Sequence, residues 1–429
     1  MSRGTSTDDA VALLRALIRN GGDERANVAT LQAFLGDAGE QEVVEPEPGR
    51  TSLVARVRGT GPEAPSLLLL GHIDVVPVGD GWAHDPVGGE LVDGEIWGRG
   101  ALDMLFLTAA YAVVLKRFAA EGGLRGDLVL AAVADEESGG RLGAGWLVEH
   151  RPDLVAASAV LSETGGVPLV RDGVVRGVTV TVGEKGGAAR RLVVHGRAGH
   201  ASTPFGSDNA LLAAAEAARR IAAAPSPAVI DDLWPRYVDA LGLDPALIDP
   251  DRLDAALADL GPLAGLAHAV THTTFSPTVL RAGDAVNVIP GTSALDVDVR
   301  TLPGVTPEDV DAHLLAALGP LAHRIELSRL VDRPANRSAT DTAVYRALAE
   351  AVEAAHPGAK AVAVLAPGGS DSRFFRAVGV PAYGFAALSA RWTHAEVRRL
   401  LHGTDERIDV ASVALTVAAL DRVVRTLLA

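Results

Sequence analysis

The sequence predicts an α/β fold in which a mainly parallel sheet is covered by helices and a second, α+β domain is inserted into the chain. Short apolar runs rich in β-branched residues alternate with longer stretches rich in Ala and Leu, which is typical of such sheets. This alternation changes near residue 186. The chain also has 429 residues, more than the roughly 250–300 at which a single hydrophobic core stops growing. We therefore expect two domains.

The strands of the first domain are expected to be buried on both faces, because their apolar runs are uninterrupted. Strands are predicted at 66–70, 128–134, 157–161 and 381–385, and helices at 103–120, 141–149, 371–378 and 410–428. An earlier helix is expected to begin at Thr7, a residue type that caps helix N-termini. In open α/β sheets, ligands bind beyond the carboxyl ends of the strands, so functional side chains should lie there.

The second domain is predicted to follow the order β-α-β-β-α-β. Its strands are placed at 190–195, 274–281, 293–301 and 324–330, and its helices at 209–224 and 307–318. A helical insert near 225–267, to which we assign no role, separates the first helix from the next strand. The expected domain segments are thus 1–185 and 333–429, which form the first domain, and 186–332, which forms the second.

The composition narrows the classes of partner. The formal net charge of -15 is spread along the chain, and it would repel nucleic acid and anionic membrane surfaces. Small molecules or peptides are the expected partners. The chain has no cysteine, so any metal must be held by imidazole and carboxylate groups. The first 20 residues lack a basic start followed by an apolar core, and no apolar run reaches the roughly 20 residues needed to span a bilayer. We therefore expect a protein that is not exported and a cytoplasmic location.

Candidate functional residues follow the predicted strands one after another. His72 ends the first strand, and Asp74 is placed to accept the second ring N–H of this histidine, as carboxylates often do for metal-binding histidines. Glu136 and Glu137 follow the strand 128–134, and Glu163 follows the strand 157–161. Taken singly, each could be a solvated strand end, but together they form a set of hard donors at one sheet edge.

Two more candidates lie outside these strands. Asp103 stands at the predicted start of a helix, where an aspartate is usually an N-cap. His402 precedes the last helix, and His394 is a nearby rival for the same role. One His, one Asp, two Glu and a second His make a donor set suited to two zinc ions that share a carboxylate, with one further Glu left to act as a base.

These motifs resemble those of the dinuclear zinc peptidase and deacylase family that includes acetylornithine deacetylase, succinyl-diaminopimelate desuccinylase, aminoacylase and glutamate carboxypeptidase. The resemblance covers nearly the whole chain in the same order. It rests on His72 to Pro77, Gly98 to Gly100 with Asp103 and Met104, Asp135 to Glu137, Glu163, Gly199 to Ser202 with Pro204, Asn287 to Pro290, Gly368 to Asp371, and His402 before Asp405 and Glu406.

The resemblance implies a zinc exopeptidase-like fold with two Zn²⁺ per subunit, for which Co²⁺ or Mn²⁺ could substitute. Asp103 would bridge the two ions, with His72 and Glu163 on one and Glu137 and His402 on the other. Glu136 would be the general base. The implied activity is hydrolysis of an amide bond next to a free carboxylate in a small substrate, such as an N-acyl amino acid or a dipeptide.

The resemblance also implies that 186–332 is a lid and dimerisation domain of a homodimer, in which His200 reaches the active site of the other subunit. Asn287 and Arg300 match lid positions that bind substrate, and Gly369 and Ser370 match substrate-binding positions of the first domain. One departure concerns 105–107, where Leu-Phe-Leu replaces the Lys-Gly of many relatives. We expect a more apolar pocket wall there.

Two other functions compete with this interpretation. A non-catalytic protein that binds peptides or amino-acid derivatives on the same fold predicts loss of the base or of a ligand, yet Glu136 and all five candidate ligands are present. An aminopeptidase with a similar metal core predicts an acidic group for the free substrate amine and no dimerisation lid.

Overall fold

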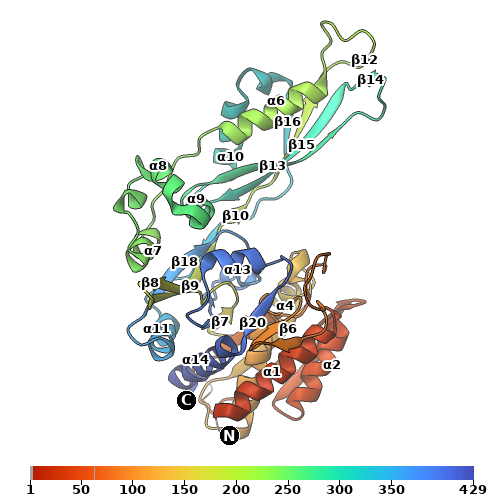
Figure 1. The fold of residues 1–429 in the computed structure, drawn as a ribbon. Helices are drawn as coiled ribbons and strands as arrows, with labels where there is room; N and C mark the ends of the chain where they lie inside the picture. The colour runs from red at the N-terminus through yellow and green to blue at the C-terminus, as the bar shows by residue number, and fades with distance from the viewer. Residues whose placement is uncertain (1–2, 62) are drawn as a thin grey trace. The chain divides into compact units, whose positions relative to one another are not determined.

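The computed structural model describes residues 3–61 and 63–429, which form two compact units (Figure 1). Unit 1 comprises Met1–Gly183, Arg236–Leu243 and Ser338–Ala429, and unit 2 comprises Glu184–Pro235 and Asp244–Arg337. The segment Arg236–Leu243 lies within the predicted helical insert but belongs to unit 1. The chain therefore passes between the units four times rather than twice.

The elements of unit 1 come from both ends of the chain. Before unit 2 they are α1 (Arg3–Arg19), α2 (Glu24–Leu35), β1 (Glu40–Glu47), β2 (Arg50–Val57), β3 (Leu67–His72), β4 (Glu90–Val92), β5 (Glu95–Trp97), α3 (Leu105–Glu121), β6 (Leu128–Val133), the 3-10 helix η1 (Glu136–Ser138), α4 (Ala144–His150), α5 (Pro152–Val155), β7 (Ala159–Ser162), β8 (Pro168–Arg171) and β9 (Val174–Glu184). After unit 2 they are α11 (Ala343–Ala355), β18 (Lys360–Ala366), α12 (Ser372–Ala377), β19 (Ala382–Gly384), α13 (His394–Leu400), β20 (Arg407–Asp409) and α14 (Val410–Leu428).

The main sheet of unit 1 has a parallel centre and antiparallel edges. Its strand order is β1-β2-β6-β3-β7-β19-β9, and β8 and β18 also pair with β9. The four central strands, β6, β3, β7 and β19, run parallel to one another, whereas β1 pairs with β2, β2 with β6, and β9 with β19 in antiparallel fashion. The expected fold class, a mainly parallel sheet covered by helices, is confirmed.

Helices cover both faces of this sheet, which explains the uninterrupted apolar strands. All six residues of β3 are buried, and successive side chains point to opposite faces. Leu68 and Leu70 share a core with Leu147 of α4 and Phe375 of α12. α3 contacts β3 and β6, and α1 and α14 pack against α3. These layers leave the carboxyl ends of the central strands as the edge where polar groups collect.

Unit 2 is built around a separate antiparallel sheet. Its elements are β10 (Gly186–Gly187), β11 (Arg190–His195), β12 (Gly199–His200), α6 (Ala210–Ala223), η2 (Pro245–Ile248), α8 (Leu253–Leu257), η3 (Ala258–Leu263), α9 (Ala264–Thr271), β13 (Thr274–Ala282), β14 (Val288–Ile289), β15 (Thr292–Thr301), α10 (Pro307–Leu318), η4 (Gly319–Arg324), β16 (Ile325–Arg329) and β17 (Asn336–Arg337). α7 (Trp234–Leu241) begins where the chain leaves this unit. The sheet order β13-β15-β11-β16, with α6 and α10 packed on it, has the β-α-β-β-α-β sequence of elements.

Several predicted elements match closely. α10, α14 and β11 have the predicted bounds, and β3 and β7 begin one or two residues later than expected. The expected helix start at Thr7 is wrong, because α1 already begins at Arg3. The antiparallel strands β1, β2 and β9 were not predicted. Within the described ranges, no helix is long and apolar enough to cross a membrane.

Candidate metal centre

Three neighbouring parallel strands bring candidate ligands to one edge of the main sheet. His72 is the last residue of β3, the turn Glu136–Ser138 follows β6, and Glu163 follows β7. Because the carboxyl ends of parallel strands meet at the same edge, residues up to 91 positions apart in sequence become neighbours. His72 Nε2 lies 3.8 Å from Glu163 Oε2.

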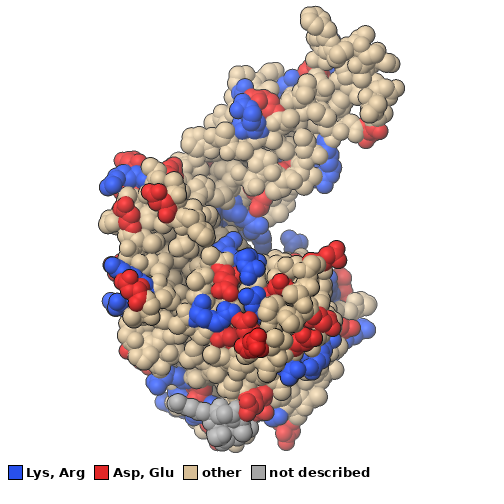
Figure 2. Space-filling model, in the orientation of Figure 1, with Lys and Arg blue, Asp and Glu red and all other residues tan. Residues whose placement is uncertain are grey.

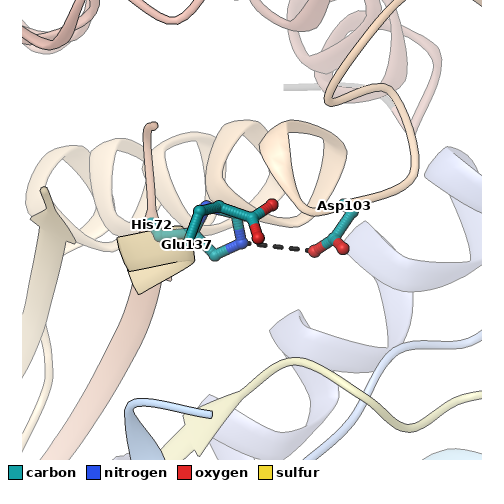
Figure 3. Close-up of side chains that lie close together, drawn as sticks. All are labelled: His72, Asp103 and Glu137. Atoms are coloured by element: carbon teal, nitrogen blue, oxygen red, sulfur yellow. Dashed lines mark hydrogen bonds and ion pairs between the residues drawn. The ribbon is translucent and has the colours of Figure 1, made fainter. Parts of the chain in front are cut away.

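Asp103 stands at the centre of this cluster and contacts both candidate histidines. Its Oδ1 lies 3.2 Å from His72 Nε2 (Figure 3), and its Oδ2 lies 3.3 Å from His402 Nε2. The N-cap of α3 is Met104 and makes no side-chain capping bond, so Asp103 is not the cap that its position suggested. A carboxylate with one oxygen directed at each of two histidines has the arrangement of a bridging ligand.

His402, and not His394, lies at the cluster. His402 Nε2 is 3.1 Å from Glu137 Oε2, in addition to its contact with Asp103. His394 Nδ1 is instead hydrogen-bonded to the Tyr237 hydroxyl, 2.8 Å away, and burial lowers the pKa of His394 to about 4. The backbone of His402 is left-handed, with φ of 59°, which is uncommon for a residue other than glycine.

Asp74 supports the cluster in a different way from the one predicted. The nearest acceptor to His72 Nδ1 is the backbone oxygen of Asp74 at 2.9 Å, while the carboxylate Oδ1 is 3.6 Å away. The carboxylate accepts the backbone N–H groups of Glu136 and Glu137 at 3.2 and 3.1 Å. The predicted residue is therefore in place, but its carboxylate mainly holds the turn that carries the two glutamates.

Among the residues that the structure describes, two groups of three ligand atoms lie close enough together to hold metal ions. In each group all three atoms are within 4.8 Å of one another. One group is His72, Asp103 and Glu137, and the other is His72, Glu136 and Glu163. Distance alone thus does not separate the predicted base, Glu136, from the predicted ligand, Glu137. The contact of Glu137 with His402 distinguishes them, and Asp135 is turned away to accept the N–H of Leu142.

The cluster carries more carboxylates than its two histidines can neutralise. Burial raises the pKa of Glu137 to about 7, and the Asp103 charge adds to the effect. Burial, followed by the Glu136 charge, raises the pKa of Glu163 well above its usual range. The hydrogen bond to Asp103 raises the pKa of His402 to about 9. These raised pKa values indicate an excess of negative charge in the site, which protonation of the imidazoles or bound metal ions can offset.

The donor set and its spacing fit zinc. Two ligand atoms of a tetrahedral zinc ion, each about 2.0–2.1 Å from the metal, lie about 3.3 Å apart. Among the described residues, the four contacts that link Nε2 of His72 or His402 to a carboxylate oxygen measure 3.1, 3.2, 3.3 and 3.8 Å. Three of these distances match that spacing, so the positions of His72, Asp103, Glu137 and His402 fit those of metal ligands.

Asp371 was not recognised as part of this region, although the Gly368-to-Asp371 motif was noted. It is 2% exposed, and neither carboxylate oxygen has a hydrogen-bond partner among the described residues. Burial, together with the Glu136 charge, raises the pKa of Asp371 well above its usual range. In the same motif, Ser370 is buried and Gly369 is exposed. The sequence did offer one indication of this buried carboxylate, since Asp371 is an acidic residue in a glycine-rich motif. We had interpreted Asp371 itself only as the start of a helix.

The predicted residues of the second domain lie in unit 2. His200 and Asn287 are exposed neighbours, because β12 pairs with β14 and Ala201 N–H donates to the Asn287 carbonyl at 3.0 Å. His200 Nδ1 is 2.7 Å from the Ser202 hydroxyl. Arg300 Nε contacts the Asp298 carboxylate at 3.0 Å.

The apolar residues that replace the usual Lys-Gly are part of the helix core. Leu105, Phe106 and Leu107 are 0%, 4% and 2% exposed in the first turn of α3. The Leu105 side chain lies against Gly100, where an added Cβ would approach its Cδ1 to 2.7 Å. These apolar side chains therefore pack behind the Asp103 loop.

A histidine and carboxylate cluster at the carboxyl edge of a mainly parallel sheet defines a metal-dependent hydrolase. Residues 68–426 match the model of Peptidase family M20/M25/M40. The chain is 27% identical over 439 residues to succinyl-diaminopimelate desuccinylase of Methylobacterium nodulans, an alignment that covers 97% of this chain and 96% of the relative.

Solved structures give the same fold. An M20 family metallo-carboxypeptidase from Sulfolobus solfataricus aligns with a TM-score of 0.73 at 16% identity and covers 100% of this chain and 99% of its own. Human carnosine dipeptidase 1 aligns with a TM-score of 0.68 at 16% identity, covering 99% and 97%. A dinuclear metal-binding peptidase of the M20 family from Bacillus subtilis has a TM-score of 0.59 at 17% identity, covering 97% and 98%.

The chain belongs to Peptidase family M20/M25/M40. It is a metal-dependent hydrolase that acts on amide bonds of small substrates. The suspected family is thereby confirmed, and the alternative of a non-catalytic binding protein is removed.

Proposed function

We propose that the protein is a two-zinc hydrolase that cleaves an amide bond next to a free carboxylate in a small substrate. The observation that carries this proposal is Asp103, whose two carboxylate oxygens are directed at His72 and His402 at 3.2 and 3.3 Å. We assign His72, Asp103 and Glu163 to one ion and Asp103, Glu137 and His402 to the other.

When bound, zinc supplies Lewis acidity toward the amide carbonyl and lowers the pKa of water toward about 7. Glu136 then acts as the general base, because it has no contact with His402 and is held in the same turn as Glu137. The backbone N–H of Glu136 donates to Asp74 Oδ1 at 3.2 Å, which holds the backbone of this residue in the turn. Glu136 accepts a proton at its carboxylate and returns it to the nitrogen of the leaving amine.

The substrate class is an N-acyl amino acid or a dipeptide. The named relatives support this choice, since they include a desuccinylase, a metallo-carboxypeptidase and a dipeptidase. Gly369 and Ser370 are proposed substrate contacts of unit 1, and Asn287 and Arg300 those of unit 2. Arg300 would exchange its contact with Asp298 for the substrate carboxylate.

We further propose that the protein is a homodimer in which unit 2 supplies His200 to the second subunit. Phe205 and Val286 support this, because their side chains are fully exposed in the two loops that flank the β12–β14 pair. The part of unit 2 around β12 and β14 also carries few charged side chains on the face shown in Figure 2. Exposed apolar residues of this kind mark protein contacts. The cytoplasmic location stays a prediction.

The proposal is tested by metal analysis and a substrate panel. Protein purified in the presence of zinc is expected to contain two zinc ions per subunit, and a His72→Ala variant fewer. Hydrolysis of N-acetyl, N-succinyl and dipeptide substrates with added Zn²⁺ identifies the substrate class. One zinc or less, with no change in the His72→Ala variant, would refute the two-zinc assignment.

A further inference from the structure

Glu406 is completely buried beside the loop that carries Asp103, although it is neither a candidate ligand nor the candidate base. Its exposed fraction is 0%. Oε1 accepts the backbone N–H groups of Leu102 and Asp103 at 2.8 and 2.9 Å, and Oε2 accepts that of Gly100 at 3.1 Å. A buried carboxylate is costly unless hydrogen bonds and a counter-charge compensate it, and three N–H groups of one loop provide the hydrogen bonds.

Arg99 supplies the counter-charge and extends the contact to two other loops. Its exposed fraction is 4%, and its Nη1 lies 2.7 Å from Glu406 Oε2. Its Nη2 donates to the backbone oxygens of Pro77 and Val78, both at 3.3 Å, and of His402 at 3.5 Å. The Arg99–Glu406 pair therefore joins the segment that follows β3, the loop of Asp103 and the loop of His402.

Neither Asp103 nor His402 is held by regular secondary structure. Asp103 precedes the N-cap of α3, so the helix does not fix its backbone. His402 has a left-handed backbone, a conformation that persists only when its surroundings impose it. The Glu406 carboxylate accepts the backbone N–H of Asp103 at 2.9 Å, and the Arg99 guanidinium donates to the backbone oxygen of His402 at 3.5 Å, beside the turn that the Gly403 N–H closes on the Leu400 carbonyl.

We propose that Glu406 is a positioning residue for the metal centre, which orients Asp103 directly and the His402 loop through Arg99. This inference rests on the proposed two-zinc function. Replacing such an outer partner of a metal ligand typically changes metal affinity or activity about 10–100-fold.

The test is the zinc affinity of the metal-free protein, measured by competition with a chromogenic chelator. In Glu406→Gln, the amide oxygen can still accept from Leu102 and Asp103, but the NH₂ group faces the donors of Arg99 and Gly100. Zinc affinity is expected to fall about 10–100-fold, and excess zinc should restore part of kcat with KM unchanged. Arg99→Lys, which keeps the charge but loses the forked donors, should weaken zinc binding as well.

Asp127→Asn is the matched control. Asp127 accepts from Arg56 Nη1 at 2.8 Å and from the Gly59 N–H at 2.9 Å, but it precedes β6, at the end of that strand opposite the metal centre. This variant should lower the Tm and leave zinc affinity unchanged.

If the Tm of Glu406→Gln falls as that of Asp127→Asn does, but its zinc affinity equals that of the wild type, the inference is overturned. If that variant does not fold, wild-type zinc affinity in Arg99→Lys overturns it instead. Wild-type protein that binds no zinc would refute the proposed function itself, whereas two zinc ions in the wild type with unchanged affinity in the variants would refute only the role of Glu406.

Discussion

His394 should give unit 1 a pH-dependent stability whose size follows from its surroundings. His394 Nδ1 lies 2.8 Å from the Tyr237 hydroxyl, and burial, followed by the Arg398 charge, lowers the pKa of His394 to about 4. An unfolded histidine titrates near 6.5. Between these values the unfolded chain binds a proton that the folded chain does not bind, so stability is full above about pH 6.5 and is lost as the pH falls toward 4.

The difference between the two pKa values corresponds to at most about 3.4 kcal/mol, of which about 2.4 kcal/mol is lost between pH 7 and pH 4.5. The assay is urea unfolding of the metal-free protein at these two pH values, so that zinc release does not contribute. His394→Gln keeps an acceptor for Tyr237 but does not titrate, and it should lose less stability than the wild type on acidification. Equal losses in the two proteins would refute this reasoning.

Three further predictions concern catalysis and the metal ions. Glu136→Gln should lower kcat about 10²–10⁴-fold with zinc retained, whereas Glu137→Gln should weaken zinc binding. Steady-state kinetics and metal analysis of both variants test this, and the reverse result would make Glu137 the general base. His402→Ala should lose one zinc ion per subunit and His394→Ala none, because, of these two histidines, only His402 contacts Asp103. Equal zinc contents in the two variants would contradict the assignment of His402 as a ligand. Glu136→Gln and His200→Ala should each be nearly inactive, and refolding them together should restore activity in mixed dimers that contain one complete site. Co-purifying, differently tagged subunits without activity would show that His200 does not act in the other subunit.

The elements that the sequence predicted best are those whose burial is decided locally. β3 and β6 are uninterrupted apolar runs, and α14 carries a clear apolar face, so each is recognisable without its neighbours. β1 pairs with β2, which in turn pairs with β6, and the pattern of β1, with charged residues on a half-exposed surface, is also typical of a loop. The positions of β1 and β2 in the sheet depend on pairing between strands, which the local sequence does not encode.

In the candidate site, too, the residues next to apolar strands were predictable from the sequence, whereas contacts made by loops were not. His72, Glu137 and Glu163 follow recognisable strands, so their meeting at one edge could be expected. The backbone oxygen of Asp74 lies nearer to His72 than its carboxylate does, and the Asp371 carboxylate is buried without a hydrogen-bond partner among the described residues. These features depend on loop conformations such as the turn after β6, which residue types alone do not determine.

The position of β19 constrains the order in which the protein can fold during synthesis. β19 lies between β7 and β9, although it is made about 200 residues after β9 has begun. At about 5–20 residues per second, roughly 10–40 s pass before the ribosome completes this strand. Until then β7 and β9 have no common neighbour, and the apolar edge of β7 is open to wrong pairing. Unit 2 needs no strand made after residue 337 and can fold while the sheet of unit 1 is still incomplete.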